Sequence, residues 1–244
     1  KHISLDSRKM AGNDLFVPII GERADGHDYI CMAIGNGATV VFTSRHKTEE
    51  EVQEAILTQC KGDKEKETAA KAAAWICVPD TRKALQDFGA YCRRNNPIPL
   101  VGITGSVGKT TTREMVAAAL SAGFLVYKTP GNSNSQVGVP ITVAEIPENA
   151  EIGVIELGMS EPGEMTRIAN VAQVNCAVMT NIGVAHIEQL GSQENILKEK
   201  LHIQDGMSEK GTLFLNGDDP LLRDVVPEGG RKKVLYGLSE GCDY

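Results

Sequence analysis

The sequence predicts an α/β fold, in which a small α/β unit is followed by a larger domain built on a parallel sheet. Short apolar runs alternate with segments whose apolar residues recur at helical spacing, which is typical of parallel strands joined through helices. The segment Asn95-Asn96-Pro97 interrupts this alternation, and its composition is typical of a boundary. The predicted domains are therefore residues 1–97 and 98–244.

The first domain is expected to alternate strands and helices. Runs of apolar and β-branched residues predict strands at Asp14–Ile20, Ala38–Thr43 and Trp75–Val78. Helical spacing predicts helices at Asp28–Ile34, Glu49–Cys60 and Thr81–Arg94. The charged run Lys61–Glu67 is expected to face solvent, as a loop or a helix face. The last helix places on one face the residues Ala84, Leu85, Phe88, Tyr91 and Cys92.

The second domain continues the alternation with four strands of the buried type. The predicted strands are Ile98–Ile103, Ile152–Glu156, Cys176–Asn181 and Thr212–Asn216. The predicted helices are Arg113–Ala122, a helix after Pro162-Gly163, and Gln193–Met207. Polar residues stand at the strand ends, where parallel sheets bind ligands. They are the loop after residue 103, Glu156, Asn181 with His186, and Asn216 with Asp218.

The loop after the first of these strands carries the strongest functional signal. Residues 100–112 read Leu-Val-Gly-Ile-Thr-Gly-Ser-Val-Gly-Lys-Thr-Thr-Thr. A strand, a glycine-rich turn, a lysine, a hydroxyl and a helix form the arrangement that cradles nucleotide phosphates. Lys109 would reach the phosphates and Thr110 would contact Mg²⁺. The strict pattern needs a glycine at position 103, where this chain has Ile103 and places Gly102 one residue earlier, so a plain glycine-rich turn stays as the alternative.

Other candidates have ordinary structural alternatives. Glu156 could take Mg²⁺ together with Thr110, or simply end a strand in solvent. His186 follows a strand end near the expected phosphates, yet an isolated histidine is commonly structural. The polar segment 129–140 could bind phosphates through its amides, or form a simple turn. Lys200 lies on a predicted helix, where a lysine normally faces solvent.

Bulk properties narrow the class of protein. The formal charge of −7 does not suit a nucleic-acid surface, and no apolar run is long enough to span a bilayer. The six cysteines form no C-x-x-C pair, which favours reduced thiols and a cytoplasmic protein. Cys77 and Cys176 lie in apolar runs and are expected in the core.

Several longer segments resemble one family. The segment Gly102-Ile-Thr-Gly-Ser-Val-Gly-Lys-Thr-Thr-Thr112 resembles the phosphate loop of the Mur ligases, with the same glycine spacing. Gly131-Asn-Ser-Asn-Ser-Gln-Val-Gly-Val-Pro140, Glu156-Leu-Gly-Met-Ser-Glu-Pro-Gly-Glu164, residues 180–196 and Leu215-Asn-Gly-Asp-Asp-Pro220 resemble the branch that uses D-alanyl-D-alanine. The segments Asp6-Ser-Arg-Lys9 and Gly21-Glu-Arg-Ala-Asp-Gly-His27 resemble the domain that binds the UDP-sugar. Residues 46–70 resemble nothing in the family and are expected to be an insertion.

The resemblance implies an ATP-dependent acid–D-amino-acid ligase of peptidoglycan precursor synthesis. Its substrates would be UDP-N-acetylmuramoyl-tripeptide and D-alanyl-D-alanine, and its cofactors ATP and Mg²⁺. The substrate carboxylate would attack the γ-phosphate to give an acyl phosphate and ADP. The amine of D-alanyl-D-alanine would then displace phosphate from the acyl phosphate. The protein is expected to be a monomer without nucleic-acid or membrane partners. Family members extend beyond both ends of this chain, so we expect a fragment with an incomplete ATPase domain that is inactive alone.

The resemblance also assigns roles to residues. The implied catalytic residues are Lys109, Glu156, His186 and Lys200, of which Lys200 matches a lysine that is carbamylated in related ligases. The implied Mg²⁺ ligands are Thr110, Glu156 and His186. The implied ATP-binding residues are Gly105, Ser106, Val107, Gly108, Lys109, Thr110, Thr111, Asn216 and Asp218. The implied substrate-binding residues are Ser7, Arg8, Arg23, Asp25, His27, Asn132 and Asn134.

Two alternatives stay open on the sequence. One is another Mur-type ligase with a different amine, such as the enzyme that adds the third amino acid. That enzyme would show an Asp-His-Leu-Asp type of motif where this chain has Ala185-His186-Ile187-Glu188. The other is a nucleotide-binding module without ligation.

Overall fold

The computed structural model describes residues 2–244, which form two compact units that divide after Leu85. The first unit comprises the residues up to Leu85, and the second comprises Gln86–Tyr244. Helix α4, Thr81–Asn95, runs through the division. The predicted domain boundary after Pro97 remains a proposal.

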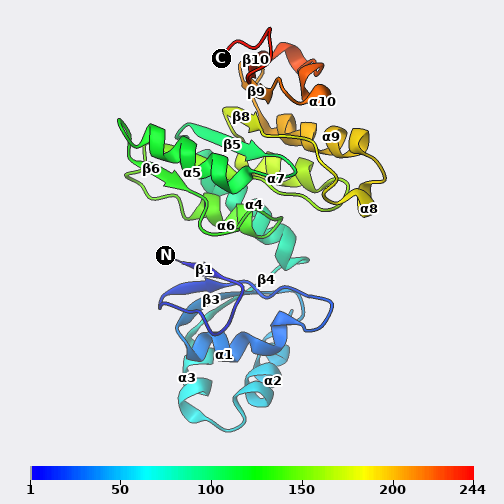
Figure 1. The fold of residues 1–244 in the computed structure, drawn as a ribbon. Coiled ribbons are helices and arrows are strands. Elements are labelled where there is room, and N and C mark those ends of the chain that lie inside the picture. The colour runs from blue at the N-terminus through cyan, green and yellow to red at the C-terminus, as the bar shows by residue number, and fades with distance from the viewer. Residues whose placement is uncertain (1) are drawn as a thin grey trace. The chain divides into compact units, whose positions relative to one another are not determined.

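The first unit is a parallel sheet with the strand order β1-β2-β3-β4 (Figure 1). Its strands are β1 Ile3–Ser4, β2 Asp14–Phe16, β3 Ala38–Thr43 and β4 Ala74–Cys77. Its helices are η1 Gly26–Tyr29, α1 Ile30–Gly35, α2 Glu49–Cys60 and α3 Lys64–Ala72. Their apolar faces close a core that includes Phe16, Ile30, Val41, Ile56 and Ala70.

The second unit is a six-stranded parallel sheet with the order β10-β9-β8-β5-β7-β6 (Figure 1). Its strands are β5 Leu100–Thr104, β6 Val126–Lys128, β7 Ile152–Glu156, β8 Cys176–Met179, β9 Thr212–Asn216 and β10 Lys232–Tyr236. Its helices after α4 are α5 Lys109–Leu120, α6 Gly138–Ala144, α7 Glu164–Ala172, α8 Ile187–Leu190, α9 Gln193–Leu201, η2 His202–Gly206, α10 Pro220–Arg223 and η3 Glu228–Gly230.

Alternating residues of the central strands feed two cores, so helices cover both faces of this sheet. Ile103 and Val154 pack with Ala117 of α5 on one face. Leu100 and Ile155 belong to the larger core on the other face, with residues of α6, α7 and α9. Strand β5 pairs with β7 on one side and β8 on the other, which brings the carboxyl ends of these three strands to the same edge.

The α/β prediction is confirmed, and several elements match their predicted bounds. Strands β3, β7 and β9 and helix α2 begin and end as predicted. The predicted strand Asp14–Ile20 ends at Phe16, shortly before Pro18, a residue that cannot donate to a sheet. The charged run is partly helical, because α3 begins at Lys64 with Asp63 as its cap.

The predicted face of α4 is wrong in part. Phe88 and Tyr91 are exposed, whereas Leu85, Gly89 and Arg93 are buried. Gly89 abuts Pro140, because a Cβ on Gly89 would lie 2.8 Å from the Cα of Pro140. The guanidinium of Arg93 donates to the carbonyls of four residues, and this pairing makes its burial possible.

The cysteine prediction is also wrong in its detail. Cys77 is exposed, as are most residues of β4, and Cys176 is half-buried at the first position of β8, where alternate residues are buried. The buried thiols are Cys31 and Cys60, which pack in the first unit. Within the described residues, none of the helices combines the length and the apolar character that a membrane crossing requires.

Candidate functional site

The glycine-rich turn between β5 and α5 has the backbone of a phosphate loop. Gly105 has φ 148° and Gly108 has φ 82°, both in the region that favours glycine. Gly108 is the N-cap of α5 and brings no side chain, so the first N–H groups of the helix stay available. Lys109 folds back over the turn, where its Nζ donates to the carbonyl of Gly105 at 2.9 Å. The turn therefore presents amide donors and a cation at one place, which suits an anion.

The segment after β8 braces this turn. The Thr180 hydroxyl donates to the Val107 carbonyl at 2.6 Å, and Asn181 Oδ1 accepts from the Val107 N–H at 3.0 Å. The Ser106 hydroxyl accepts from the Gly183 N–H at 2.9 Å. A Cβ on Gly105 would lie 1.9 Å from the Thr180 hydroxyl, so the close approach requires glycine. Sequence reasoning did not find Thr180, since a threonine at a strand end carries no distinctive signal.

Glu156 ends β7 beside the turn, and its side chain is buried. Its Oε2 accepts from the Thr110 hydroxyl at 3.1 Å, and its Oε1 accepts from Asn134 Nδ2 at 2.8 Å. The Thr129 hydroxyl accepts from its backbone N–H at 2.9 Å. Three residues predicted from separate motifs, Thr110, Asn134 and Glu156, thus meet through direct contacts. A carboxylate and a hydroxyl are oxygen donors of the kind that Mg²⁺ prefers, so the donor set fits this ion.

Arg113 completes this group, and sequence reasoning missed it. Its Nη1 lies 3.2 Å from Glu156 Oε2 and 2.6 Å from the Gly131 carbonyl. Its side chain is almost fully buried, and Nε and Nη2 both donate to Glu114. A signal was present, because Arg113 lies three residues after Thr110 and therefore on the same helix face.

Lys200 is buried, which contradicts the structural alternative of a solvent-facing lysine. Its Nζ donates to the Gly105 carbonyl at 3.2 Å, the same oxygen that Lys109 contacts. Burial, and to a smaller extent the charge of Lys109, lower the pKa of Lys200 to about 7 against the opposing effect of Glu199. A fraction of this amine is therefore neutral and nucleophilic near neutral pH.

Other predicted residues lie apart from these contacts or in contacts of their own. His186 is exposed at the start of α8 with φ 65°, and Asn132 and Thr111 are exposed. Asn216 Nδ2 donates to the Thr180 carbonyl at 2.9 Å, whereas Asp218 accepts from the N–H groups of residues 238 and 239. Among residues 2–244, no cluster of three or more His, Cys, Asp or Glu side chains could hold a metal ion.

In the first unit, His27 organises the end of β3. The ring is fully buried, with Nδ1 2.6 Å from Asp25 Oδ1. Nε2 accepts from the Ser44 N–H at 3.0 Å and lies 3.2 Å from the Ser44 hydroxyl. Arg45 forms ion pairs with Asp25 and Asp28. Burial alone would raise the pKa of Asp25, but hydrogen bonds from His27 leave this pKa below its ordinary value. Both ring nitrogens of His27 are thus engaged inside the protein.

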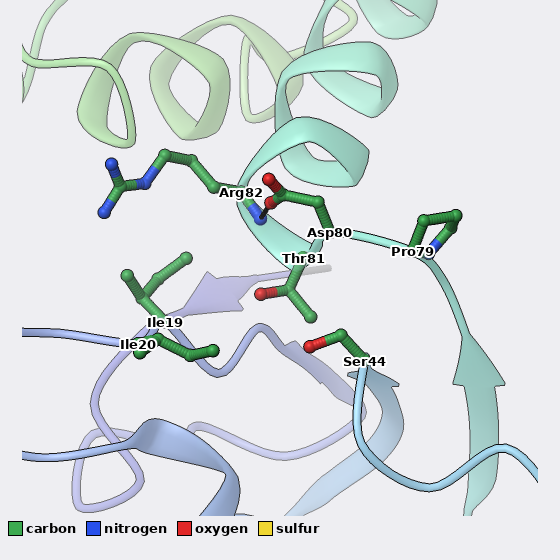
Figure 2. Close-up of a pocket in the computed structure, with 7 residues that line it drawn as sticks. All are labelled: Ile19, Ile20, Ser44, Pro79, Asp80, Thr81 and Arg82. Atoms are coloured by element: carbon green, nitrogen blue, oxygen red, sulfur yellow. Dashed lines mark hydrogen bonds between the residues drawn. The ribbon is translucent and has the colours of Figure 1, made fainter.

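The described residues of the first unit line several cavities, two of which bear on the predicted site. One, of about 560 Å³, is lined by residues that include Ser7, Arg8 and Met32. The other, of about 260 Å³, lies between Ile19, Ser44 and Thr81 (Figure 2). The predicted residues Ser7 and Arg8 therefore line a cavity, whereas Arg23 is exposed and does not line these cavities.

Comparison with known proteins decides the family. Residues 103–244 match the model of the Mur ligase middle domain, which covers more than half of the chain. The chain belongs to the Mur ligase family. Residues 1–92 match a second model, described as the catalytic domain of the Mur ligase family.

Within the Mur ligases, the chain resembles the members known as MurF. It is 37% identical over 242 residues to the UDP-N-acetylmuramoyl-tripeptide–D-alanyl-D-alanine ligase of Bacillus subtilis, covering 99% of this chain and 48% of that protein. The crystal structure of MurF from Acinetobacter baumannii matches with a TM-score of 0.81 and 29% identity, over 99% of this chain and 48% of the other. MurF from Thermotoga maritima in complex with ADP matches with a TM-score of 0.79 and 30% identity, over 97% and 50% of the two chains. The chain thus spans about half the length of these relatives.

Proposed function

We propose that the protein carrying this chain is an ATP-dependent ligase that joins D-alanyl-D-alanine to UDP-N-acetylmuramoyl-tripeptide in the cytoplasm. The observation that carries the proposal is the contact of the Thr110 hydroxyl with the buried Glu156 carboxylate beside the phosphate loop. A loop, a hydroxyl and a carboxylate in this order serve phosphoryl transfer. The 37% identity to the Bacillus subtilis ligase supports the choice of substrates.

In this proposal the second unit binds ATP. The N–H groups at the start of α5 and the residues Gly105 to Thr111 receive the phosphates, and Lys109 turns from the Gly105 carbonyl to the γ-phosphate. Thr110 and Glu156 would hold Mg²⁺, and His186 is the third residue proposed to bind it. When bound, this ion neutralises phosphate charge. Asn216 and Asp218 are proposed on the nucleoside side.

The chain's own residues then position the carboxylate that is activated. Asn134, held by Glu156, and Asn132 are proposed to orient the substrate beside the phosphates. The substrate carboxylate attacks the γ-phosphate, ADP leaves, and the amine of D-alanyl-D-alanine displaces phosphate from the acyl phosphate. The low pKa of Lys200 favours the neutral amine that carbamylation needs, which supports a carbamylated Lys200 in this enzyme.

The first unit is proposed to bind the UDP-sugar. Ser7 and Arg8 line a cavity of about 560 Å³, which supports contact with this ligand. Arg23, Asp25 and His27 are proposed to belong to the same binding site. Because His27 is buried, its proposed role is to position Asp25 and Ser44 through its ring nitrogens.

The deciding experiment measures ADP release by the full-length protein. With UDP-muramoyl tripeptide and ATP, we expect ADP release that depends on added D-alanyl-D-alanine, together with a ligated product in mass spectrometry. ADP release at the same rate with and without D-alanyl-D-alanine would contradict ligation. Release with another amine only would point to a different Mur-type ligase, and ATP binding without release would point to a binding module.

A further inference from the structure

Arg113 connects three parts of the second unit that are far apart in sequence. From α5 it reaches the Glu156 carboxylate at the end of β7 and the carbonyl of Gly131 in the polar segment 129–140. Its Nη1 makes both contacts, at 3.2 and 2.6 Å. Its remaining donors are taken by Glu114, which also pairs with Lys128. A buried arginine whose three guanidinium nitrogens all donate hydrogen bonds is held in one position.

The arginine shares one carboxylate oxygen with the proposed metal ligand. Glu156 Oε2 faces both Thr110 Oγ1 and Arg113 Nη1, while Oε1 faces Asn134. A divalent cation on Thr110 and Glu156 would use the oxygen that Arg113 neutralises. Two cations that seek one oxygen repel each other, and the repulsion is strong where side chains are buried. The ion pair and the bound cation therefore compete.

The same arginine touches the proposed substrate segment. Gly131, whose carbonyl Arg113 holds, is followed directly by Asn132, and Asn134 binds Glu156 from the other side. The Glu156 carboxylate is thus held by Thr110 and Arg113 of α5 and by Asn134 of the polar segment, and Arg113 bonds to both Glu156 and that segment. A change in the Arg113–Glu156 contact would therefore alter the position of the polar segment directly, through the hydrogen bond from Arg113 to the Gly131 carbonyl.

We infer that Arg113 is a positioning residue that holds Glu156 and the polar segment together, competes with the divalent cation for Glu156 Oε2, and so sets the Mg²⁺ requirement of the nucleotide site. The inference rests on the proposed function, because it needs a nucleotide site at the phosphate loop. A merely structural arginine would predict the opposite direction, since its loss would disorder Glu156 and raise the Mg²⁺ requirement.

The test is a Mg²⁺ titration of nucleotide binding in the protein that contains this chain, with a fluorescent ADP analogue as the probe. Arg113→Gln keeps a hydrogen-bond donor and removes the charge, so we expect half-maximal binding at a Mg²⁺ concentration roughly three- to tenfold lower. Arg113→Lys keeps the charge, so its Mg²⁺ requirement should stay close to that of the unaltered protein. Lys128→Met is the matched control, because it removes a cation from Glu114 without touching Glu156, and its requirement should stay within about twofold.

An unchanged or raised Mg²⁺ requirement in Arg113→Gln would overturn the inference. If the unaltered protein binds no nucleotide at any Mg²⁺ concentration, the nucleotide site itself fails and the inference falls with it. If nucleotide binding depends on Mg²⁺ but the requirement is the same with and without Arg113, the inference is overturned while the proposed nucleotide site stands.

A measurement without any variant covers the case in which Arg113→Gln does not fold. The Nη–H resonances of Arg113 are followed by NMR in the ADP-saturated protein, before and after Mg²⁺ is added. We expect the Nη1–H resonances and the backbone amide of Asn132 to shift together, because Nη1 contacts both Glu156 and the Gly131 carbonyl, which belongs to the peptide bond before Asn132. Identical spectra would contradict the competition.

Discussion

The two units place their predicted functional residues in opposite ways. In the second unit, predicted residues from separate motifs meet: Thr110 and Asn134 both contact Glu156. In the first unit, the predicted residues mostly serve the fold or lie apart. Arg8 is exposed and pairs with its neighbour Asp6, whereas His27 is buried with both ring nitrogens engaged.

The difference reflects the kind of ligand that each unit is proposed to take. A phosphate is bound by backbone amides at a helix start, so the local chain carries most of the site. A sugar nucleotide is bound by side chains that line a cavity, and that cavity depends on how the elements pack.

Lys109→Ala should have the largest effect. Removing the lysine of the phosphate loop should weaken nucleotide binding by roughly 100-fold or more and abolish ligation in the full-length enzyme. Equilibrium binding of a fluorescent ADP analogue and ADP release measure the two losses. Lys210→Ala removes an exposed lysine of the same unit and should change neither. Unaltered nucleotide binding in Lys109→Ala would remove the basis of the contrast.

His27→Ala should destabilise the first unit by roughly 2–4 kcal/mol, because it leaves the Ser44 N–H and the half-buried Asp25 without their ring partner. Chemical denaturation measures the loss. Arg8→Ala, at an exposed residue with the same predicted role, should leave the stability nearly unchanged, because its ion pair with Asp6 is exposed to solvent. If His27→Ala kept its stability and lost only UDP-sugar binding, His27 would be a direct contact and the two units would be alike.

Lys200→Met should change how stability depends on pH. The folded-state pKa of about 7 lies below the ordinary lysine value, so between about pH 7 and pH 10 the unfolded chain holds a proton that the folded protein has released. Stability of the unaltered protein therefore rises with pH across that window, and the full cost of the buried charge is present below it.

The variant lacks this cost and should be more stable by roughly 1–3 kcal/mol near pH 6.5, with the difference shrinking toward pH 10. Urea denaturation across this range, in buffer free of carbon dioxide, measures the difference. Parallel curves for the two proteins would show that Lys200 is not a buried titrating group.

Thr48→Ala should have the smallest effect, confined to the first unit. Thr48 and Glu51 form a capping box at the start of α2, and its loss should cost about 1 kcal/mol. Hydrogen exchange in α2 measures the change, and Thr58→Ala on the exposed side of the same helix is the control. Altered nucleotide binding in Thr48→Ala would show that the two units are energetically coupled.

Much of the fold follows from local patterns. The β-branched runs of β3 and β7 and the capped helix α2 were predicted with their bounds, because apolar periodicity and capping act over a few residues. Strands β1, β6 and β10 and helices α6, α8 and α10 were missed. Most of them are short, β1 having two residues only, and β6 and β10 lie at sheet edges, where partly exposed residues leave little apolar pattern.

The site was predicted where its chemistry is local and missed where it depends on partners. The roles proposed for Lys109, Thr110 and Glu156 remain predictions, yet the structure places all three at one edge of the sheet. Arg113 and Thr180 were not identified, because their partners lie 43 and 73 residues away. The solvent-facing alternative for Lys200 failed for the same reason, since its burial depends on a turn 95 residues away.

The sequence by itself determined the phosphate loop of this Mur ligase chain. Glycines at 105 and 108 permit the positive φ angles, and the helix that starts at Lys109 supplies unpaired N–H groups. The ion pair between Arg113 and Glu156 and the burial of Lys200 depend on the tertiary structure. Backbone sterics act between neighbouring residues, whereas burial and charge pairing depend on elements that meet only when the sheet assembles.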